Sequence, residues 1–252
     1  MKFISWNVLN VNKKLRRLLD FIYKQDPDVV CLQELPESFA EQIRDEGEYH
    51  VEYTYDFVTE SPHAGATICT LSKKSPVRST EISYFEKGYS TLMDTLIYKK
   101  LRKTTELHKA VLTEFQESNI VVINARLSCA IGTCDRLEQF ENILKTLDKT
   151  KINILCGDFN IMDSRLFNIL TGWGRGFRKP DYLTNERKTF DKLCEEYGFV
   201  NVFKGQSTHM LRYPMKQLDH ILVPKGVSVS ESFISRFRNG SDHKMLVVSL
   251  DI

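Results

Sequence analysis

The chain has 252 residues, enough to bury a substantial apolar core without disulfides or a structural metal. Its 42% apolar and 27% charged residues are ordinary for a globular protein and exclude a disordered or fibrous chain. Lys and Arg number 35 against 33 Asp and Glu, so the formal charge of +2 does not by itself indicate a nucleic-acid binder. No run approaches the ~20 apolar residues of a membrane span, and no signal-peptide pattern is present. We therefore expect a cytoplasmic protein with no membrane partner, and assume a monomer.

The chain begins with an alternation of strand and helix patterns. Residues 2–6 and 29–32 are short apolar runs that favour strands, and residues 15–23 between them place apolar side chains at helical spacing. The middle of the chain is richer in strands. Five runs there predict a meander of mainly antiparallel strands: residues 51–58, 64–71, 77–84, 92–101 and 108–115.

The second half returns to alternating patterns. Strands are predicted at residues 120–127, 152–156, 218–223, 227–233 and 245–250. Helices are predicted at residues 136–147, 164–170 and 186–197. Roughly a dozen strands with helices between them predict an α/β (α+β) fold, in which two mixed β-sheets pack face to face and are flanked by helices. No linker or internal repeat interrupts the chain, so we expect a single domain over residues 1–252.

Polar side chains recur directly after or within the apolar runs. The clusters are Trp6-Asn7, Gln33-Glu34, Asn124-Ala125-Arg126, Gly157-Asp158-Phe159-Asn160, Asp219-His220 and Ser241-Asp242-His243. Because strand ends can present functional groups to one shared cleft, this recurrence predicts a single site built from distant parts of the chain.

The residue types in these clusters suit phosphate chemistry. A carboxylate at Glu34 suits a hard cation such as Mg²⁺, although a surface charge or helix cap is the alternative. Asp158 and Asn160 are two residues apart and point the same way in an extended chain, where they can orient a water molecule and accept its proton. An Asx turn is the alternative there, and a simple turn is the alternative for Asn7. His243, with acids at Asp242 and Asp219, suits an imidazolium that neutralises a phosphoryl oxygen.

In their order along nearly the whole chain, these motifs resemble the endonuclease/exonuclease/phosphatase superfamily. That superfamily includes AP endonucleases, deoxyribonucleases, tyrosyl-DNA phosphodiesterases, deadenylases and lipid or inositol phosphatases. The resemblance implies a four-layer α/β sandwich and a Mg²⁺ or Mn²⁺ cofactor. It implies Glu34 as the main metal ligand, with Asn7 and Asp242 near the metal or the phosphate.

The resemblance also implies roles for the remaining polar residues. Asp158 would position or deprotonate the attacking water with the help of Asn160, and His243 would contact the phosphate while Asp219 holds it. Asn124 belongs to the same catalytic set. Arg136, on the helix that follows Asn124, matches a less specific pattern of substrate-binding arginines, for which a position on the helix surface is the alternative.

Two positions depart from the superfamily pattern. Many nuclease members carry an acid two residues after the first Asn, where this chain has Leu9, so we expect fewer metal ligands at that end and a single-metal site. Arg126 stands where relatives carry His or Tyr. Arginine cannot transfer protons near neutral pH, but its guanidinium can clamp a phosphate, and we predict that role for Arg126. Pairing with an acid is the alternative.

Aromatic and basic residues share the loop 172–179, which contains Trp173 and Arg175 and has a composition suited to nucleic-acid contact. A packed surface loop is the alternative. The stretch 183–190 resembles AP endonucleases, although the aromatic-ended motif of those enzymes is missing near Asp219. We therefore predict a Mg²⁺-dependent phosphodiesterase acting on nucleic acid, with DNA as the expected partner. A phosphatase or phosphodiesterase for small molecules or lipid headgroups, and a catalytically inactive binding module, are the alternatives.

Overall fold

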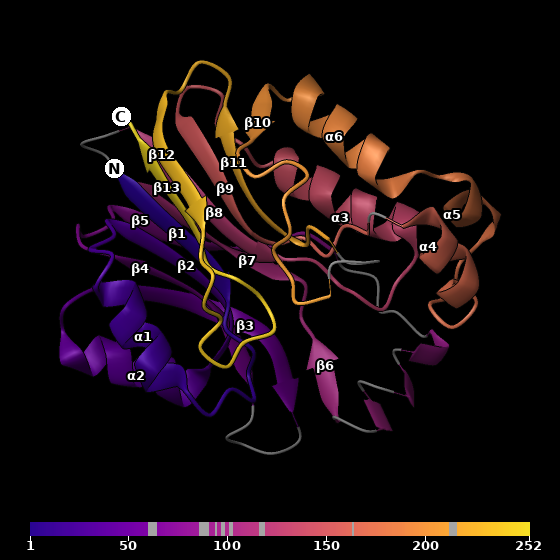
Figure 1. Cartoon of the computed structure of the whole chain (residues 1–252), viewed down its shortest axis with the longest axis horizontal. Helices are drawn as coiled ribbons and strands as arrows, with labels where there is room; N and C mark the ends of the chain where they lie inside the picture. Colours follow the sequence, from indigo (N-terminus) through magenta and orange to yellow (C-terminus); the bar gives the residue numbers. More distant parts are fainter. Residues whose placement is uncertain are drawn as a thin grey trace.

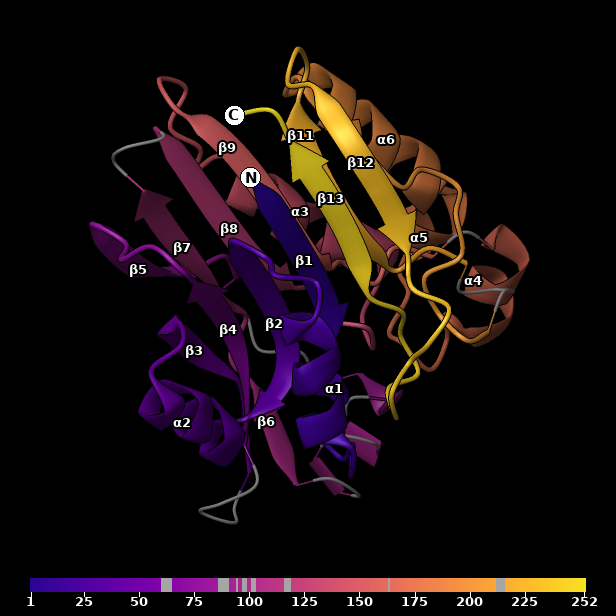
Figure 2. The ribbon, with the colours of Figure 1, turned by 60° about the vertical axis from the view of Figure 1, so that its left-hand side comes forward.

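The computed structural model describes residues 1–59, 65–85, 91–93, 95–96, 99–100, 103–115, 119–162, 164–211 and 216–252. Within them, two β-sheets pack face to face, with two helices over one sheet and the other helices over the second (Figures 1 and 2). This arrangement confirms the predicted pair of packed sheets and is the four-layer α/β sandwich that the family resemblance implies. No helix in the described part of the chain is long and apolar enough to cross a membrane.

The first sheet has seven strands in the order β12-β13-β1-β2-β4-β3-β6. Their bounds are β1 Lys2–Asn7, β2 Val29–Pro36, β3 His50–Thr59, β4 Ala66–Ser72, β6 Thr104–Glu106, β12 Val229–Ile234 and β13 Leu246–Leu250. Helices α1 (Leu15–Tyr23) and α2 (Glu37–Glu46) cover its outer face, where Ile22 and Ile43 pack in one buried cluster with Trp6 of β1. The β1-α1-β2 unit pairs β1 and β2 in parallel, and this places the ends of both strands at the same edge.

The second sheet has six strands in the order β10-β11-β9-β8-β7-β5. Their bounds are β5 Arg78–Ser83, β7 Lys109–Phe115, β8 Ile120–Arg126, β9 Ile152–Asp158, β10 Phe199–Asn201 and β11 Asp219–Pro224. The helices on this side are α3 Thr133–Leu144, α4 Arg165–Thr171, α5 Lys179–Leu183 and α6 Glu186–Glu196. The rings of Phe140 on α3 and Phe190 on α6 lie 4.6 Å apart against the sheet.

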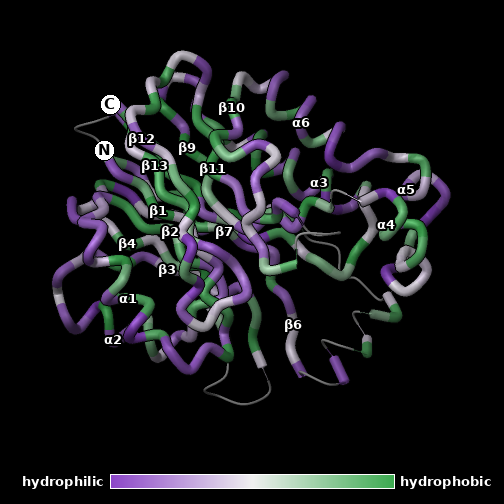
Figure 3. Tube along the Cα trace, viewed as in Figure 1, coloured by the Kyte–Doolittle hydropathy of each residue, from purple (hydrophilic) through white to green (hydrophobic). Residues whose placement is uncertain are grey.

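The central strands are buried on both faces. In β8, Val121 and Ile123 pack toward the helices, whereas Ile120 and Val122 belong to the cluster between the sheets. A strand buried on both faces reads as a continuous apolar run rather than an alternating one. Figure 3 shows such hydrophobic runs along the strands, while the outer helices alternate between hydrophobic and hydrophilic residues.

Strand register aligns charged residues in the second sheet. Arg126 of β8 lies opposite Asp158 of β9, and Asp158 lies opposite Asp219 of β11. Gly157 allows β9 to lie close to β8 at this point, because a Cβ atom there would be only 1.9 Å from the Ala125 carbonyl oxygen. The fold therefore places these three charged side chains at the same edge of the second sheet.

The structure differs from the sequence prediction at several elements. The strand predicted at 92–101 is wrong, because residues 92–93, 95–96 and 99–100 are helical; residues 94, 97–98 and 101 lie outside the described part. Helices α2 and α5 and strands β6 and β10 were not predicted. Helix α2 buries only Ala40 and Ile43, which is too narrow an apolar stripe to stand out in the sequence.

A buried ionic network joins α3, α6 and the loop after β9. The Arg136 side chain is fully buried: its Nη1 lies 3.2 Å from Glu186 Oε1 and donates to the Asn160 carbonyl at 2.8 Å. Glu186 Oε2 accepts the Asn168 side chain, which in turn accepts from Arg175 Nη2 at 2.7 Å. Both guanidinium groups lie inside the protein, which corrects the prediction that Arg136 and Arg175 bind substrate.

We expect Arg136→Met to lower the free energy of unfolding by about 3–5 kcal/mol, because it leaves the Glu186 carboxylate buried without its cation. Urea unfolding followed by circular dichroism measures the change. Lys145→Ala is the control, since Lys145 pairs with Glu141 on the exposed surface of the α3 end and should cost about 1 kcal/mol or less. Equal losses for the two variants would contradict a structural role for the Arg136 network.

Candidate active site

Asn7 joins the two sheets at the edge where their strands end. Its Nδ2 donates to Glu34 Oε1 at 3.1 Å and to Asp158 Oδ2 at 2.9 Å, so one amide contacts residues from β2 and β9. Its own Oδ1 accepts the backbone N–H of Leu9, and its carbonyl oxygen accepts the Ser241 hydroxyl at 2.7 Å. The structure thus brings together Asn7, Glu34 and Asp158, three of the residues singled out in the sequence.

Three residues around this point have left-handed backbone conformations. The φ angles are 62° at Leu9, 56° at Glu34 and 52° at Asn160. Such conformations are uncommon for residues other than glycine and cost on the order of 1–3 kcal/mol each when they are strained. They persist where surrounding contacts fix the chain, and here they redirect the backbone shortly after β1 and β9 and within β2, where the pairing with β4 changes register between Leu32 and Leu35.

His243 is held by Asp219 in a buried ion pair. The His243 Nδ1 lies 2.9 and 3.0 Å from the two Asp219 carboxylate oxygens. Burial alone would lower the pKa of His243, but the charges of Asp219 and Asp158 outweigh it and raise this pKa to about 10. The ring is therefore an imidazolium at neutral pH, with Nδ1 donating to Asp219 and the Nε2–H available to another acceptor.

For Asp158, burial and a neighbouring acid outweigh the nearby positive charges, so its pKa is raised. Burial raises its pKa, the positive charge of His243 opposes this and the negative charge of Asp219 adds to it, giving a pKa of about 6. Its Oδ1 accepts the Asn160 backbone N–H at 3.2 Å and its Oδ2 accepts the Asn7 amide. At neutral pH it is thus mainly ionised, fixed in place and basic enough to accept a proton.

Glu34 and Asp242 supply oxygen atoms suited to a hard cation. Burial would raise the Glu34 pKa, but Arg126 and Asn7 outweigh it and lower this pKa. Both of those groups contact Oε1, and within the described part of the chain no hydrogen bond involves Oε2, so this oxygen could bind a cation. Asp242 Oδ1 is buried and has no hydrogen-bond partner among the described residues. Carboxylate oxygens of this kind fit Mg²⁺ or Mn²⁺.

Acidic and imidazole groups gather in two overlapping sets. Ligand atoms of Asp158, Asp219 and His243 lie within 4.8 Å of one another, and so do those of His209, Asp242 and His243. His209 was not predicted from the sequence, since it lies in an irregular stretch between β10 and β11 with no periodic signal. Its ring centroid is 4.9 Å from that of His243.

Arg126 pairs with three acids rather than facing the cleft. It is 5% exposed, with Nε 3.1 Å from Glu34 Oε1 and Nη1 3.3 Å from Asp56 Oδ1 and 3.1 Å from Glu106 Oε1. This corrects the prediction of a phosphate clamp and agrees with the alternative of acid pairing. Asp56 and Glu106 were missed, although an Asp between aromatic residues in a strand is an unusual signal. Burial raises the Asp56 pKa to about 7, against the charge of Arg126.

The two predicted catalytic asparagines make structural contacts. Asn124 is fully buried between the sheets, where its Nδ2 donates to the Leu32 and Cys69 carbonyls and its Oδ1 accepts from Gln33 at 2.7 Å. The Asn160 Nδ2 donates to the Leu127 carbonyl at 2.8 Å. Asn124 therefore joins the two sheets. Asn160 holds the Asp158 side chain at the end of β9 through its backbone N–H.

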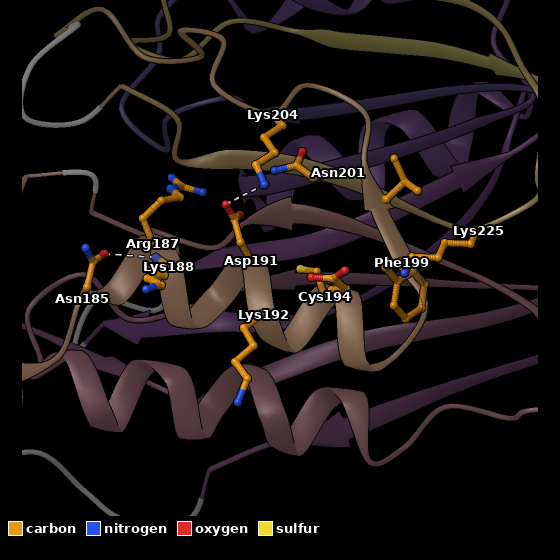
Figure 4. A pocket seen from close by; sticks show the side chains of 12 residues that line it. Asn185, Arg187, Lys188, Asp191, Lys192, Cys194, Phe199, Asn201, Lys204 and Lys225 are labelled. Atoms are coloured by element: carbon orange, nitrogen blue, oxygen red, sulfur yellow. Dashed lines mark hydrogen bonds and ion pairs between the residues drawn. The ribbon is translucent and has the colours of Figure 1, made fainter.

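A separate hollow of about 790 Å³ lies along α6 and β10 (Figure 4). Its lining includes Lys188, Lys192 and Lys204 but none of the residues that surround Asn7. Arg187 at its edge reaches inward to His220 Nε2 at 2.9 Å. The hollow is thus a feature of the outer helix and not part of the candidate active site.

Comparison with known proteins identifies the family. The model of the Endonuclease/Exonuclease/phosphatase family matches residues 4–243. An exodeoxyribonuclease of Bacillus subtilis (strain 168) is 25% identical over 207 residues, which are 81% of this chain and 75% of that protein. A DNA-(apurinic or apyrimidinic site) endonuclease of Dictyostelium discoideum is 26% identical over 212 residues, 81% of this chain but 53% of the relative, so the match spans about half its length.

Solved structures share the same fold. An endonuclease/exonuclease/phosphatase protein from Beutenbergia cavernae superposes with a TM-score of 0.69 at 18% identity, over 99% of this chain and 71% of that one. An AP endonuclease from Archaeoglobus fulgidus gives a TM-score of 0.63 at 17% identity over the full length of both chains. The chain belongs to the Endonuclease/Exonuclease/phosphatase family.

Proposed function

We propose that the protein is a Mg²⁺- or Mn²⁺-dependent phosphodiesterase that hydrolyses nucleic acid, with DNA as its substrate. The observation that carries this proposal is the juxtaposition of a charged His243 with an ionisable Asp158 beside the carboxylates of Glu34 and Asp242. The exodeoxyribonuclease and the apurinic-site endonuclease among its relatives support nucleic acid as the substrate class.

The side chains divide the work of an in-line hydrolysis. Asp158, fixed by Asn7 and by the Asn160 backbone, orients the attacking water and takes its proton as the new P–O bond forms. His243 donates from Nε2 to a phosphoryl oxygen as negative charge builds there, while Asp219 keeps the ring charged and oriented. The bond to the leaving oxygen breaks as the new bond forms, no covalent enzyme intermediate arises, and the leaving oxygen takes its proton from solvent water. A divalent cation held by Glu34 and Asp242 would neutralise charge on the phosphoryl and leaving oxygens.

The exposed charges of the segment 164–190, which follows β9 along the chain, support contact with a polyanion. Between residues 164 and 190, a stretch described in full, the exposed charged side chains are all basic: Arg165, Arg178, Lys179 and Lys188. The two acids of this stretch, Asp181 and Glu186, are buried. Trp173 belongs to the same segment and is 70% exposed, as expected of a side chain that stacks on a base.

A substrate panel at fixed salt, with and without Mg²⁺, tests the proposed function directly. We expect metal-dependent cleavage of DNA, with Asp158→Ala and His243→Ala each lowering kcat by about 10³-fold. The panel includes abasic and nicked duplexes, single-stranded DNA, RNA, 5′-tyrosyl DNA and inositol phosphates. Preference for inositol phosphates would overturn the nucleic-acid assignment, and turnover in no arm would indicate a binding module.

The pH dependence of the reaction tests the roles of the two titrating groups. As pH rises through about 6, Asp158 loses its proton and kcat/KM should increase; as pH approaches 10, His243 loses its proton and kcat/KM should fall. Asp219→Asn removes the charge that raises the His243 pKa, so the falling limb should move to lower pH by at least about one unit. Asp148→Asn, on the exposed surface, is the control, and an unmoved limb in Asp219→Asn would refute the pairing.

Base stacking by Trp173 predicts a loss of affinity on truncation. Trp173→Ala should weaken binding of fluorescein-labelled single-stranded DNA by about fivefold or more, because a stacked base contributes about 1–3 kcal/mol. Fluorescence anisotropy in EDTA at constant ionic strength measures the affinity without cleavage. Tyr197→Ala, which removes a partly exposed aromatic ring at the end of α6, should leave it unchanged. Equal affinities for Trp173→Ala and the wild type would place the nucleic acid elsewhere.

A further inference from the structure

The segment 207–211 is hydrogen-bonded to the residues on either side of His243. The backbone N–H of Met210 donates to the Asp242 carbonyl at 2.9 Å, and the Lys244 N–H donates to the Thr208 carbonyl at 2.8 Å. His209 and His243 face each other across this short antiparallel bridge. His209 is 6% exposed, so its ring is fixed beside the candidate metal ligand Asp242.

The same segment also contacts the partner of His243. The Thr208 hydroxyl oxygen accepts the backbone N–H groups of Leu218 and Asp219 at 3.0 and 3.1 Å. Residue 209 is therefore placed by hydrogen bonds to both β11 and the segment before β13. This degree of fixation is what a residue needs if it orients another side chain.

Hydrogen bonding fixes which nitrogen of His209 carries the proton. The backbone N–H of Leu211 donates to His209 Nδ1 at 3.2 Å, so Nδ1 is an acceptor. In the neutral imidazole the proton is then on Nε2. Nε2 lies 3.5 Å from Asp242 Oδ2, and it offers an N–H rather than a lone pair. In this neutral form His209 presents an N–H toward the Asp242 carboxylate, and neither ring nitrogen offers a free lone pair to a metal.

The two oxygens of Asp242 consequently have different surroundings. Oδ2 faces the His209 N–H, while Oδ1 has no hydrogen-bond partner in the described part of the chain and lies 3.8 Å from His243 Nε2. Asp242 thus has one carboxylate oxygen held beside the His209 ring and the other available to a ligand.

We propose that His209 is a positioning residue for the metal site, and that its Nε2–H holds Asp242 Oδ2 so that Oδ1 is directed at the divalent cation. The inference rests on the proposed function, because it takes Asp242 as a metal ligand. A metal site built from few carboxylates depends strongly on the orientation of each one.

Binding of Mn²⁺ to the apoprotein, measured by isothermal titration calorimetry and by electron paramagnetic resonance, tests this role without relying on turnover. We expect His209→Leu to weaken Mn²⁺ binding by about 10- to 100-fold, since loss of a group that orients a ligand typically has this effect. His209→Gln should bind within about threefold of the wild type, because its amide N–H reaches close to the position of Nε2. Thermal unfolding in EDTA identifies any variant that fails to fold.

A double-mutant cycle with Asp242 separates orientation of this ligand from a general structural effect. If His209 acts through Asp242, then His209→Leu combined with Asp242→Asn should bind Mn²⁺ no more weakly than Asp242→Asn alone. Additive losses would overturn the proposal, and so would equal affinities for His209→Leu and the wild type.

The same titration distinguishes this inference from the proposed function. A wild-type protein that binds neither Mn²⁺ nor Mg²⁺ would overturn metal dependence and the His209 role together. A wild-type protein that binds Mn²⁺, with His209→Leu equal to it, would overturn the role of His209 alone.

Discussion

The hydrogen bonds from the Asn7 amide to Glu34 and Asp158 are the contact on which the site depends. Asn7 and Glu34 belong to the seven-stranded sheet, whereas Asp158 and Asp219 belong to the six-stranded one. The distance between the candidate metal ligand and the candidate base is thus set by how the two sheets pack. Apolar side chains such as Phe3, Cys31 and Ile154 fill the space between the sheets, so the packing of this core determines the geometry of the site.

Charge balance is the second constraint on this edge of the sandwich. Glu34, Asp56, Asp158 and Asp219 are all buried there, and Arg126 and His243 are the positive groups in direct contact with them. Bringing several carboxylates together in a low dielectric costs free energy unless cations accompany them. The remaining excess of negative charge favours a divalent cation, while Arg126 stabilises Glu34 through Oε1.

Sequence patterns predicted the strands that are buried on both faces. Strands such as β8 and β9 are unbroken apolar runs, and the polar residues at their ends met at one site. The direction of a long side chain was not readable: Arg136 and Arg175 have the composition of phosphate ligands but turn inward to Glu186 and Asn168. His209 and Asp56 were missed for a related reason, since their roles arise from contacts with residues more than 30 positions away.

The hydrogen bonds of Asn124 between the sheets constrain the geometry of the site. Asn124 on β8 donates hydrogen bonds to carbonyl oxygens on β2 and β4, and any sliding of one sheet over the other would break those bonds. Relative sliding is therefore opposed before any ligand arrives. The repulsion among the gathered carboxylates is overcome during folding, so the side chains of the site hold their relative positions without any ligand.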